Sequence, residues 1–475
     1  YLLGETAEVS NLFTCCGFNS IGIASSGGAG RVTAEWMING YMNEDLYSLD
    51  IKRFQKFHSS KKFIMNRVTE TLGDLYGMHW PYKQYKTSRN QKLLPYHEEL
   101  KNVGACFGQS GEYERPMWYA INGVKPEYNY SFNYQNWYPS VEYECKNAIK
   151  NVGLFELSPF SKYEIKGEKV FEELQRLCTA NIKDEIGKCT YTQMLNESAG
   201  IETDLTVICI DKNHFRLISS AAVRTHDKAH ILKHLSNEVE FKDVTDELIC
   251  LGLFGPKSRN LLAKITNEDL SNEKFRFGTS KNVKLGTINI WAQRLSYVGE
   301  LGYELYVDSH HGSDLYNLIL NSGKDFGITH CGAHAMDIMR MESGFLHWGQ
   351  DISPEENQYE AGLNFAISFK KDVNFLGKDV LLEMKDKKPN KRLVMLALKN
   401  SKPGEPLLLH DKIIGETTSG NYSFNFNKNL SFGYIKSDLG NEELFKKNLY
   451  IEVEKKKYLA EILLKPLKQS NFKNI

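Results

Sequence analysis

The sequence is short of the features that mark several large classes of protein. Its nine cysteines are scattered over 475 residues and none forms a CxxC pair, which argues against a disulfide framework or a structural zinc site. Lysine plus arginine equals aspartate plus glutamate, at 59 each, so no excess positive charge is available for nucleic acid or an anionic membrane. No apolar run is long enough to span a bilayer. We therefore expect a cytoplasmic protein with neither a nucleic-acid nor a membrane partner.

A complete dinucleotide-binding fingerprint is also missing. Residues 8–26 are small and apolar, residues 27–30 read Gly-Gly-Ala-Gly, and a helical pattern follows over residues 31–38. A strand, a glycine loop and a helix N-terminus would cradle the phosphate of a cofactor, although glycine is equally needed where a helix packs closely on a sheet. No full G-x-G-x-x-G motif with a downstream acid is present. Because the chain begins with Tyr1, we expect it to be a piece of a longer polypeptide.

One carboxylate stands alone on an apolar, β-branched strand. Asp204 follows the turn at Gly200, and the strand continues to Ile210, turns at residues 211–213 and returns over residues 215–218. This pattern predicts a β-hairpin. A carboxylate held by rigid backbone and facing a cavity is placed as a catalytic or ligand-orienting acid must be. The alternative is an aspartate at a strand edge that caps the turn.

A predicted helix over residues 225–237 carries three histidines spaced four residues apart: His226, His230 and His234. Such spacing could place two or three imidazoles on one metal ion. The histidines lie opposite an apolar stripe that we expect to be buried, formed by Ala229, Leu232 and Leu235. No carboxylate or cysteine is placed to complete a site, so we interpret the histidines as a solvated face and predict no metal.

Five further residues could form a ligand site with Asp204. Tyr191 lies on the strand before the glycine turn, Tyr297 and Glu304 on a predicted strand pair over residues 285–306, Arg340 on a helix that ends at Gly344, and Trp348 on the following loop. An acid, a guanidinium and aromatic rings suit a planar heterocycle with an anionic tail. Arg340 could instead pair with an acid on its own helix, Asp337 or Glu342.

From about residue 140 onward, blocks of sequence resemble the folate-binding T-protein (aminomethyltransferase) of the glycine-cleavage system, in family order. They are TYTQMLN (190–196), GIETDLTV (200–207), YVGELGYE (297–304), RMESG (340–344), YEAGL (359–363) and GETTSG (415–420). The resemblance implies tetrahydrofolate as a cofactor and Asp204 as the catalytic carboxylate near the folate nitrogens. It places Tyr191, Tyr297, Glu304 and Arg340 at folate-site positions, while Trp348 replaces the tyrosine usual in stand-alone transferases.

The first third resembles dimethylglycine and sarcosine dehydrogenases, through residues 27–30, GACFG (104–108) and ERPMW (114–118). From the residues alone, residues 104–119 could equally be an interdomain packing segment. The resemblance implies an FAD-dependent oxidation of an N-methylated amino acid, with Gly27, Gly28 and Gly30 contacting FAD only in a full-length protein. The released one-carbon unit would pass to tetrahydrofolate and give 5,10-methylene-tetrahydrofolate. The absent N-terminal flavin domain would be the partner of this chain.

The implied fold class is α+β. We expect the end of an FAD-dependent oxidoreductase domain over residues 1–50, a middle domain over 51–135, a T-protein-like folate-binding domain over 136–370, and a small β-barrel over 371–475. Two other functions stay open: a stand-alone folate-dependent aminomethyltransferase or demethylase, and a non-catalytic regulatory relative.

Overall fold

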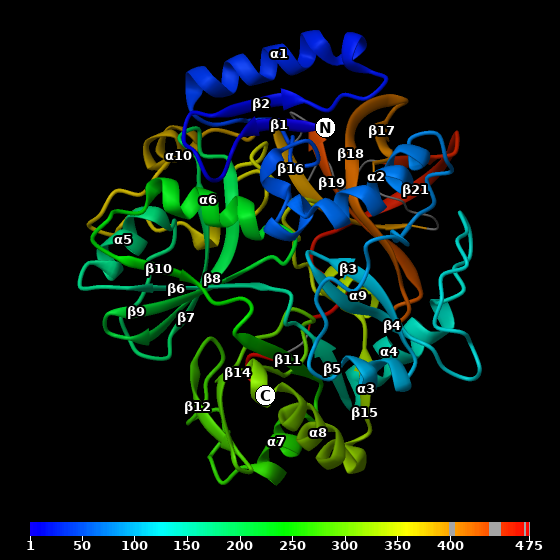
Figure 1. The fold of residues 1–475 in the computed structure, drawn as a ribbon, viewed down its shortest axis with the longest axis vertical. Coiled ribbons are helices and arrows are strands. Elements are labelled where there is room, and N and C mark those ends of the chain that lie inside the picture. The colour runs from blue at the N-terminus through cyan, green and yellow to red at the C-terminus, as the bar shows by residue number, and fades with distance from the viewer. Residues whose placement is uncertain (399–403, 437–447, 470–471, 475) are drawn as a thin grey trace.

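The computed structural model describes residues 1–398, 404–436, 448–469 and 472–474. Figure 1 shows an N-terminal unit at the top, a five-stranded sheet at the left, a six-stranded sheet at the bottom and a barrel at the upper right. Helices and strands mix throughout, so the expected α+β class with a C-terminal barrel is confirmed. Within the described residues, none of the helices combines the length and apolar character that crossing a membrane requires.

The N-terminal unit is a β-hairpin covered by one long helix. Its elements are β1 (Leu2–Glu5), β2 (Phe13–Cys16), α1 (Gly22–Asn39), the 3-10 turns η1 (Ile51–Arg53) and η2 (Lys56–Ser59), and α2 (Lys61–Asp74). Helix α1 buries Ala29, Val32 and Trp36 against the hairpin. It ends at Gly40, whose φ of 80° is the left-handed conformation that glycine supplies at a helix C-terminus.

The expected glycine loop at residues 27–30 is wrong. Gly27, Gly28 and Gly30 lie inside α1, and none of them has a positive φ. The buried positions Ala29, Val32 and Trp36 follow the three- and four-residue spacing of a helix face. The glycine content suggested a loop, but the buried face of the helix already begins at Ala29, inside the glycine segment. Packing of that face against the hairpin therefore favours a helix.

Two sheets form the centre of the molecule. The five-stranded sheet has the order β10 (Glu240–Asp243), β6 (Ser161–Lys166), β9 (His214–Ser219), β8 (Ile201–Asp211) and β7 (Cys189–Leu195), and it packs against α5 (Val170–Leu177) and α6 (Arg224–His234). The antiparallel pairing of β8 with β9 confirms the hairpin predicted around Asp204. Buried β-branched and aliphatic residues such as Ile201, Val207 and Ile208 hold β8 in the core.

The six-stranded sheet is built on a longer stretch of chain. Its order is β12 (Ser280–Leu285), β13 (Ile288–Gln293), β14 (Gly302–Asp308), β11 (Leu248–Phe254), β5 (Val152–Glu156) and β15 (Ile328–Cys331). Around it lie α3 (His97–Asn102), the hairpin β3 (Ala105–Ser110) and β4 (Tyr113–Tyr119), α4 (Tyr138–Lys150), α7 (Ser258–Ile265), α8 (Gly312–Gly323) and α9 (Ala333–Glu342). Tyr113 and Tyr119 of β4 share one core with the sheet, so this hairpin belongs to the central packing.

A closed barrel follows, with the order β16 (Lys391–Leu398), β19 (Lys428–Lys436), β18 (Lys412–Ser423), β17 (Pro406–Leu409), β20 (Leu449–Val453) and β21 (Lys456–Leu463). The connection to it contains η5 (Asn364–Ala366) and α10 (Lys378–Met384), and short turns η3 (Ser309–His311) and η4 (Lys324–Phe326) flank α8. Helix α9 ends where expected, since Gly344 has a φ of 75°. Met341 of α9 packs with Leu430 and Phe432 of the barrel, which joins the barrel to the central sheets.

The helical state of residues 27–30 can be tested by alanine substitution. Gly28→Ala should stabilise α1 by about 0.5–1 kcal/mol, because alanine loses less backbone entropy than glycine in a helix interior. A Cβ atom at Gly28 meets nothing within 4 Å. Hydrogen exchange of the α1 amides should slow. Gly40→Ala is the matched control and should have the opposite effect, since its φ is 80°; faster exchange in Gly28→Ala would contradict the helix.

Candidate functional site

Asp204 is held by the pairing of β7 with β8. Its register partner is Gln193, whose Nε2 donates to Asp204 Oδ1 at 2.7 Å. Gln193 Oε1 accepts in turn from Gln358 Nε2 at 2.5 Å. This pair of amides fixes the orientation of the carboxyl group. Gln193 was not singled out from the sequence, although its position two residues after Tyr191 places both side chains on one face of the strand.

The environment of Asp204 keeps its carboxyl near its titration point. Burial raises the pKa of Asp204 to about 6, while the neutral hydrogen-bond donors Gln193 and Tyr191 act in the opposite direction. A carboxyl group with a pKa near the working pH can both accept and return a proton, as general acid–base catalysis requires.

Tyr191 and Tyr297 bring aromatic rings to the same place. Tyr191 is 38% exposed, and its ring stacks on that of Phe365 with 6.2 Å between the ring centres. The charge of Asp204 acts on both tyrosines and raises the pKa of each, in addition to the larger effect of burial. Tyr297 lies in the connection between β13 and β14, so its expected place on a strand is wrong. Its hydroxyl donates to the Leu346 carbonyl at 2.8 Å, which anchors the ring from the loop after α9.

Glu304 lies on β14, between Gly252 of β11 and Gln293 of β13. Burial raises the pKa of Glu304 to about 7, and the Tyr306 hydroxyl, which donates to it at 2.8 Å, opposes the shift. Among the described residues it forms no direct contact with Asp204. Gln293, opposite Glu304, is buried with both amide atoms unpartnered in the described protein. A carboxyl and an unpartnered amide side by side fit the donors and acceptors of a pterin ring edge.

Arg340 lies inside the protein and is fully buried. Its five N–H groups have these acceptors: Asp337 Oδ1 at 2.8 Å, Asp351 Oδ2 at 2.5 Å, the Phe345 carbonyl at 3.0 Å, Ser419 Oγ at 2.8 Å and Gln350 Oε1 at 3.3 Å. The pairing with Asp337 matches the alternative weighed from the sequence, but in a buried network that joins α9 to barrel strand β18. With every donor engaged by protein, Arg340 acts on the site through the loop that it holds.

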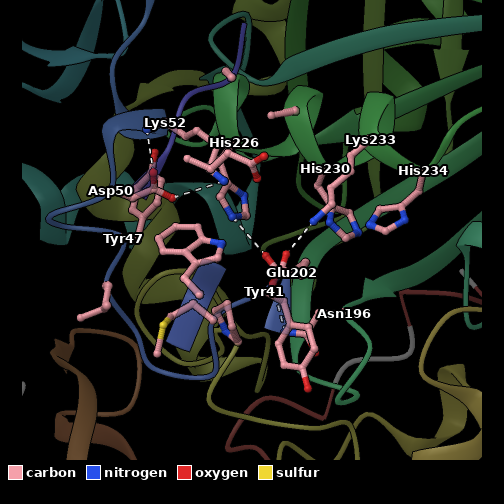
Figure 2. A pocket seen from close by; sticks show the side chains of 18 of the residues that line it. Tyr41, Tyr47, Asp50, Lys52, Asn196, Glu202, His226, His230, Lys233 and His234 are labelled. Carbon is pink, nitrogen blue, oxygen red and sulfur yellow. Dashed lines mark hydrogen bonds and ion pairs between the residues drawn. The ribbon is translucent and has the colours of Figure 1, made fainter. Parts of the chain in front are cut away.

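Trp348 lies away from Asp204. Its indole Nε1 donates to the Ile201 carbonyl at 3.0 Å, and its ring lies 5.4 Å from that of Tyr47 and 5.0 Å from that of His226. These neighbours belong to a second pocket, which is shown in Figure 2. Among the described residues, Trp348 thus contacts neither the Tyr191 ring nor the Asp204 carboxyl group.

The second pocket lies between the N-terminal unit and α6, and its volume is about 200 Å³. Its lining includes Tyr41, Tyr47, Asp50, Asn196, Glu202, His226, His230, Lys233 and His234. Figure 2 shows His226 pointing at Glu202, with Nε2 at 3.2 Å from Glu202 Oε2 and Nδ1 at 3.3 Å from Asp227 Oδ1.

The predicted orientation of α6 is therefore wrong. His226 is buried, whereas Leu232 of the expected apolar stripe is 45% exposed. Two carboxylates flank His226: Glu202 of β8 and Asp227, the next residue of α6. Their negative charges compensate the charge of His226, so this polar face of the helix can be buried. Within the described residues, no three His, Cys, Asp or Glu side chains are grouped so as to hold a metal ion.

The His226 cluster predicts a pH-dependent stability. Burial alone would lower the pKa of His226, but the hydrogen bonds that His226 donates to Asp227 and Glu202 outweigh it and raise the pKa to about 9. Because the folded pKa exceeds the ordinary value of 6.5, this stabilisation is complete below pH 6.5 and is lost as the pH rises through about 9. Wild-type free energy of unfolding, measured by urea titration, should fall over that window.

His226→Gln should lower the free energy of unfolding by about 3–5 kcal/mol at pH 7, because two buried carboxylates lose their cation. Its stability should also lose the dependence on pH between 6.5 and 9. His310→Gln is the control, since His310 is 68% exposed beside Asp308 and should change stability by at most about 1 kcal/mol. The same pH slope in wild type and His226→Gln would show that His226 is neutral in the fold.

Comparison with known proteins identifies the family of each part of the chain. Residues 96–371 match the family model of the GCVT N-terminal domain, residues 39–93 that of the FAD dependent oxidoreductase central domain, and residues 391–468 that of the glycine cleavage T-protein C-terminal barrel domain. The chain is similar to the aminomethyltransferase T of the glycine cleavage system from Bartonella henselae, with a TM-score of 0.68 and 23% identity over 80% of this chain and 98% of that one, a likeness that shows the fold.

Curated relatives extend the comparison over nearly the whole chain. It is 37% identical to 4-methylaminobutanoate oxidase (formaldehyde-forming) from Paenarthrobacter nicotinovorans, over 92% of this chain and 54% of that protein. It is 32% identical to mitochondrial dimethylglycine dehydrogenase from Rattus norvegicus, over 98% and 54%. The chain spans about half the length of these relatives. It belongs to the glycine-cleavage T-protein family and carries, ahead of the T-protein domains, the central domain of an FAD-dependent oxidoreductase.

Proposed function

We propose that the site around Asp204 binds tetrahydrofolate and captures a one-carbon unit on it, as the C-terminal portion of an FAD-dependent N-methyl-amine dehydrogenase. The observation that carries this proposal is Asp204 itself. It is oriented by Gln193, its pKa is about 6, and Tyr191 and Tyr297 lie beside it, within a matched T-protein domain. The names of the relatives support an N-methylated amino acid or amine as the source of the carbon.

The residues present fit a bound folate. Tyr191 and Tyr297 offer ring faces, and Glu304 with Gln293 offers a carboxyl and an unpartnered amide for the pterin edge. When bound, tetrahydrofolate supplies nitrogen nucleophiles for a one-carbon electrophile. Asp204 accepts the proton released as such a nitrogen is alkylated, and its negative charge stabilises a cationic carbon donor close to it.

The residues present do not fit FAD. Gly27, Gly28 and Gly30 lie within α1 and form no nucleotide-binding loop. We assign amine oxidation to a separate flavin domain, which would be the partner of this chain, and derive no step through flavin here. A stand-alone aminomethyltransferase or demethylase would act without that partner, and a regulatory relative would bind folate without turnover. A one-carbon capture assay therefore distinguishes the three functions.

Asp204→Asn should slow formation of methylene-tetrahydrofolate from formaldehyde and tetrahydrofolate by roughly a hundredfold, the usual contribution of a positioned acid or base. The amide keeps the shape of the carboxyl, so the dissociation constant for tetrahydrofolate and the melting temperature should change little.

The wild-type rate should rise as the pH increases through about 6, because the ionised form of Asp204 is the base. Asp211→Asn, at the exposed end of the same strand, is the control. A wild-type rate in Asp204→Asn would contradict the catalytic role, and tight binding with no wild-type turnover would favour the regulatory alternative.

Glu304 and Arg340 should respond differently to substitution. Glu304→Gln should weaken tetrahydrofolate binding by about ten- to a hundredfold, the effect of losing one hydrogen bond to a charged group, with little change in stability. Arg340→Ala should lower the free energy of unfolding by about 3–5 kcal/mol, because Asp351 is left buried and unpaired. Calorimetry and urea unfolding of both variants check these expectations. Unchanged affinity in Glu304→Gln would place the pterin elsewhere.

A further inference from the structure

Among the residues that the structure describes, the cation Arg115 has no carboxylate within ion-pair distance. It lies on β4, opposite Gly108 of β3. Its Nη2 is 3.7 Å from Met336 Sδ of α9, and its guanidinium carbon is 5.7 Å from the centre of the Phe160 ring. A sulfur and a ring face are weak partners for a guanidinium with five donors.

The acids around Arg115 are engaged elsewhere. Glu114, its chain neighbour, binds Arg89 Nε at 2.8 Å. Asp337 binds Arg340 at 2.8 Å and also accepts from the Asn421 amide at 2.5 Å. Glu156 accepts from the Ser158 amide at 2.7 Å and from the Tyr96 hydroxyl.

Within the described residues, Arg115 Nε is buried without any hydrogen-bond partner, and burial lowers the pKa of the guanidinium. A partly buried cation in this state is costly, so the arrangement needs a reason other than packing.

Tyr297 connects Arg115 to the folate site. Arg115 contacts Met336 and Phe160. Met336 belongs to the hydrophobic cluster against which both Phe160 and Tyr297 pack, so the guanidinium lies in the same cluster as this tyrosine of the proposed folate site. Electrostatic interactions of Tyr297 with both Arg115 and Asp204 agree with this placement.

We propose that Arg115 is a carboxylate-binding residue of the Asp204 site, which rests on the proposed folate function. The planar fork of arginine matches a carboxylate in two parallel hydrogen bonds, and a ligand carboxylate would supply the direct ion pair that Arg115 lacks among the described residues. Two ligands carry this group: tetrahydrofolate in its glutamyl tail, and a glycine-type amino acid that yields or receives the one-carbon unit. Residues 114–118, which from the sequence alone could be a packing segment, would then contribute a binding group.

Calorimetric titrations of the 475-residue chain can test the role of Arg115. The probes are tetrahydrofolate, tetrahydropterin, which is the reduced ring system without the carboxylate-bearing tail, and glycine added to the chain saturated with tetrahydropterin. Arg115→Gln should weaken binding of tetrahydrofolate or glycine by about ten- to a hundredfold, while tetrahydropterin affinity stays unchanged. Arg115→Lys keeps the charge without the fork and should give a smaller loss. Arg31→Gln removes an exposed arginine, 52% accessible, and is the control.

Each outcome separates the alternatives. A loss for tetrahydrofolate alone identifies the glutamyl tail, and a loss for glycine alone identifies the amino acid; both support the proposal. An equal loss for tetrahydropterin, or no loss for either carboxylate ligand, would overturn it. If Arg115→Gln does not fold, the wild type decides: salt should weaken tetrahydrofolate or glycine binding more than tetrahydropterin binding, and equal salt effects on all three would overturn the proposal. Failure of the wild type to bind either tetrahydrofolate or tetrahydropterin would instead contradict the proposed function itself.

Discussion

The buried guanidinium of Arg340 is the interaction on which the arrangement of the site depends. It joins α9, the loop over residues 345–351 and barrel strand β18 through five hydrogen bonds. The loop that it holds carries the Leu346 carbonyl, to which the Tyr297 hydroxyl donates. A charge whose donors are all engaged by protein groups thus sets the position of the Tyr297 ring. Because Asp351 is buried as well, the network tolerates loss of neither partner.

Glu202 and Asp204, both on β8, have different hydrogen-bond partners, and this difference suits Glu202 to a structural role and Asp204 to a chemical one. Glu202 is buried beside His226, and hydrogen bonding to that cation lowers the pKa of Glu202 to about 2 in spite of burial. Asp204, two residues on, has only neutral partners, and burial raises its pKa to about 6. The first carboxylate stays ionised and ties the pocket of Figure 2 together. The second can change its protonation state at working pH, which a proton acceptor needs.

Sequence patterns correctly predicted those elements that are determined by residues close together in the chain. The β8–β9 hairpin, the C-terminal barrel and the end of α9 at Gly344 are confirmed, because alternation, turn residues and a C-terminal glycine act over a few residues. The glycine segment within α1 and the buried face of α6 were predicted wrongly. Partners distant in sequence decide both, as when Glu202 makes His226 fit for burial. The expected ligand residues were assigned from the resemblance to a known family. The sequence alone could not show that Arg340 donates its hydrogen bonds to Asp351 and Ser419.

The side-chain amides of Gln193 and Gln358 determine the hydrogen bonding on one side of Asp204. Gln358 Nε2 donates to Gln193 Oε1 and also to Thr179 Oγ1 at 3.0 Å, so Gln193 must turn its own NH₂ group toward Asp204. An amide offers no basic atom that could take a proton from a carboxylic acid near neutral pH. The amide side of Asp204 therefore offers no route for a proton. In the proposed reaction, a proton gained by Asp204 would leave on the other side of the carboxyl group, where Tyr191 and the bound ligand would lie.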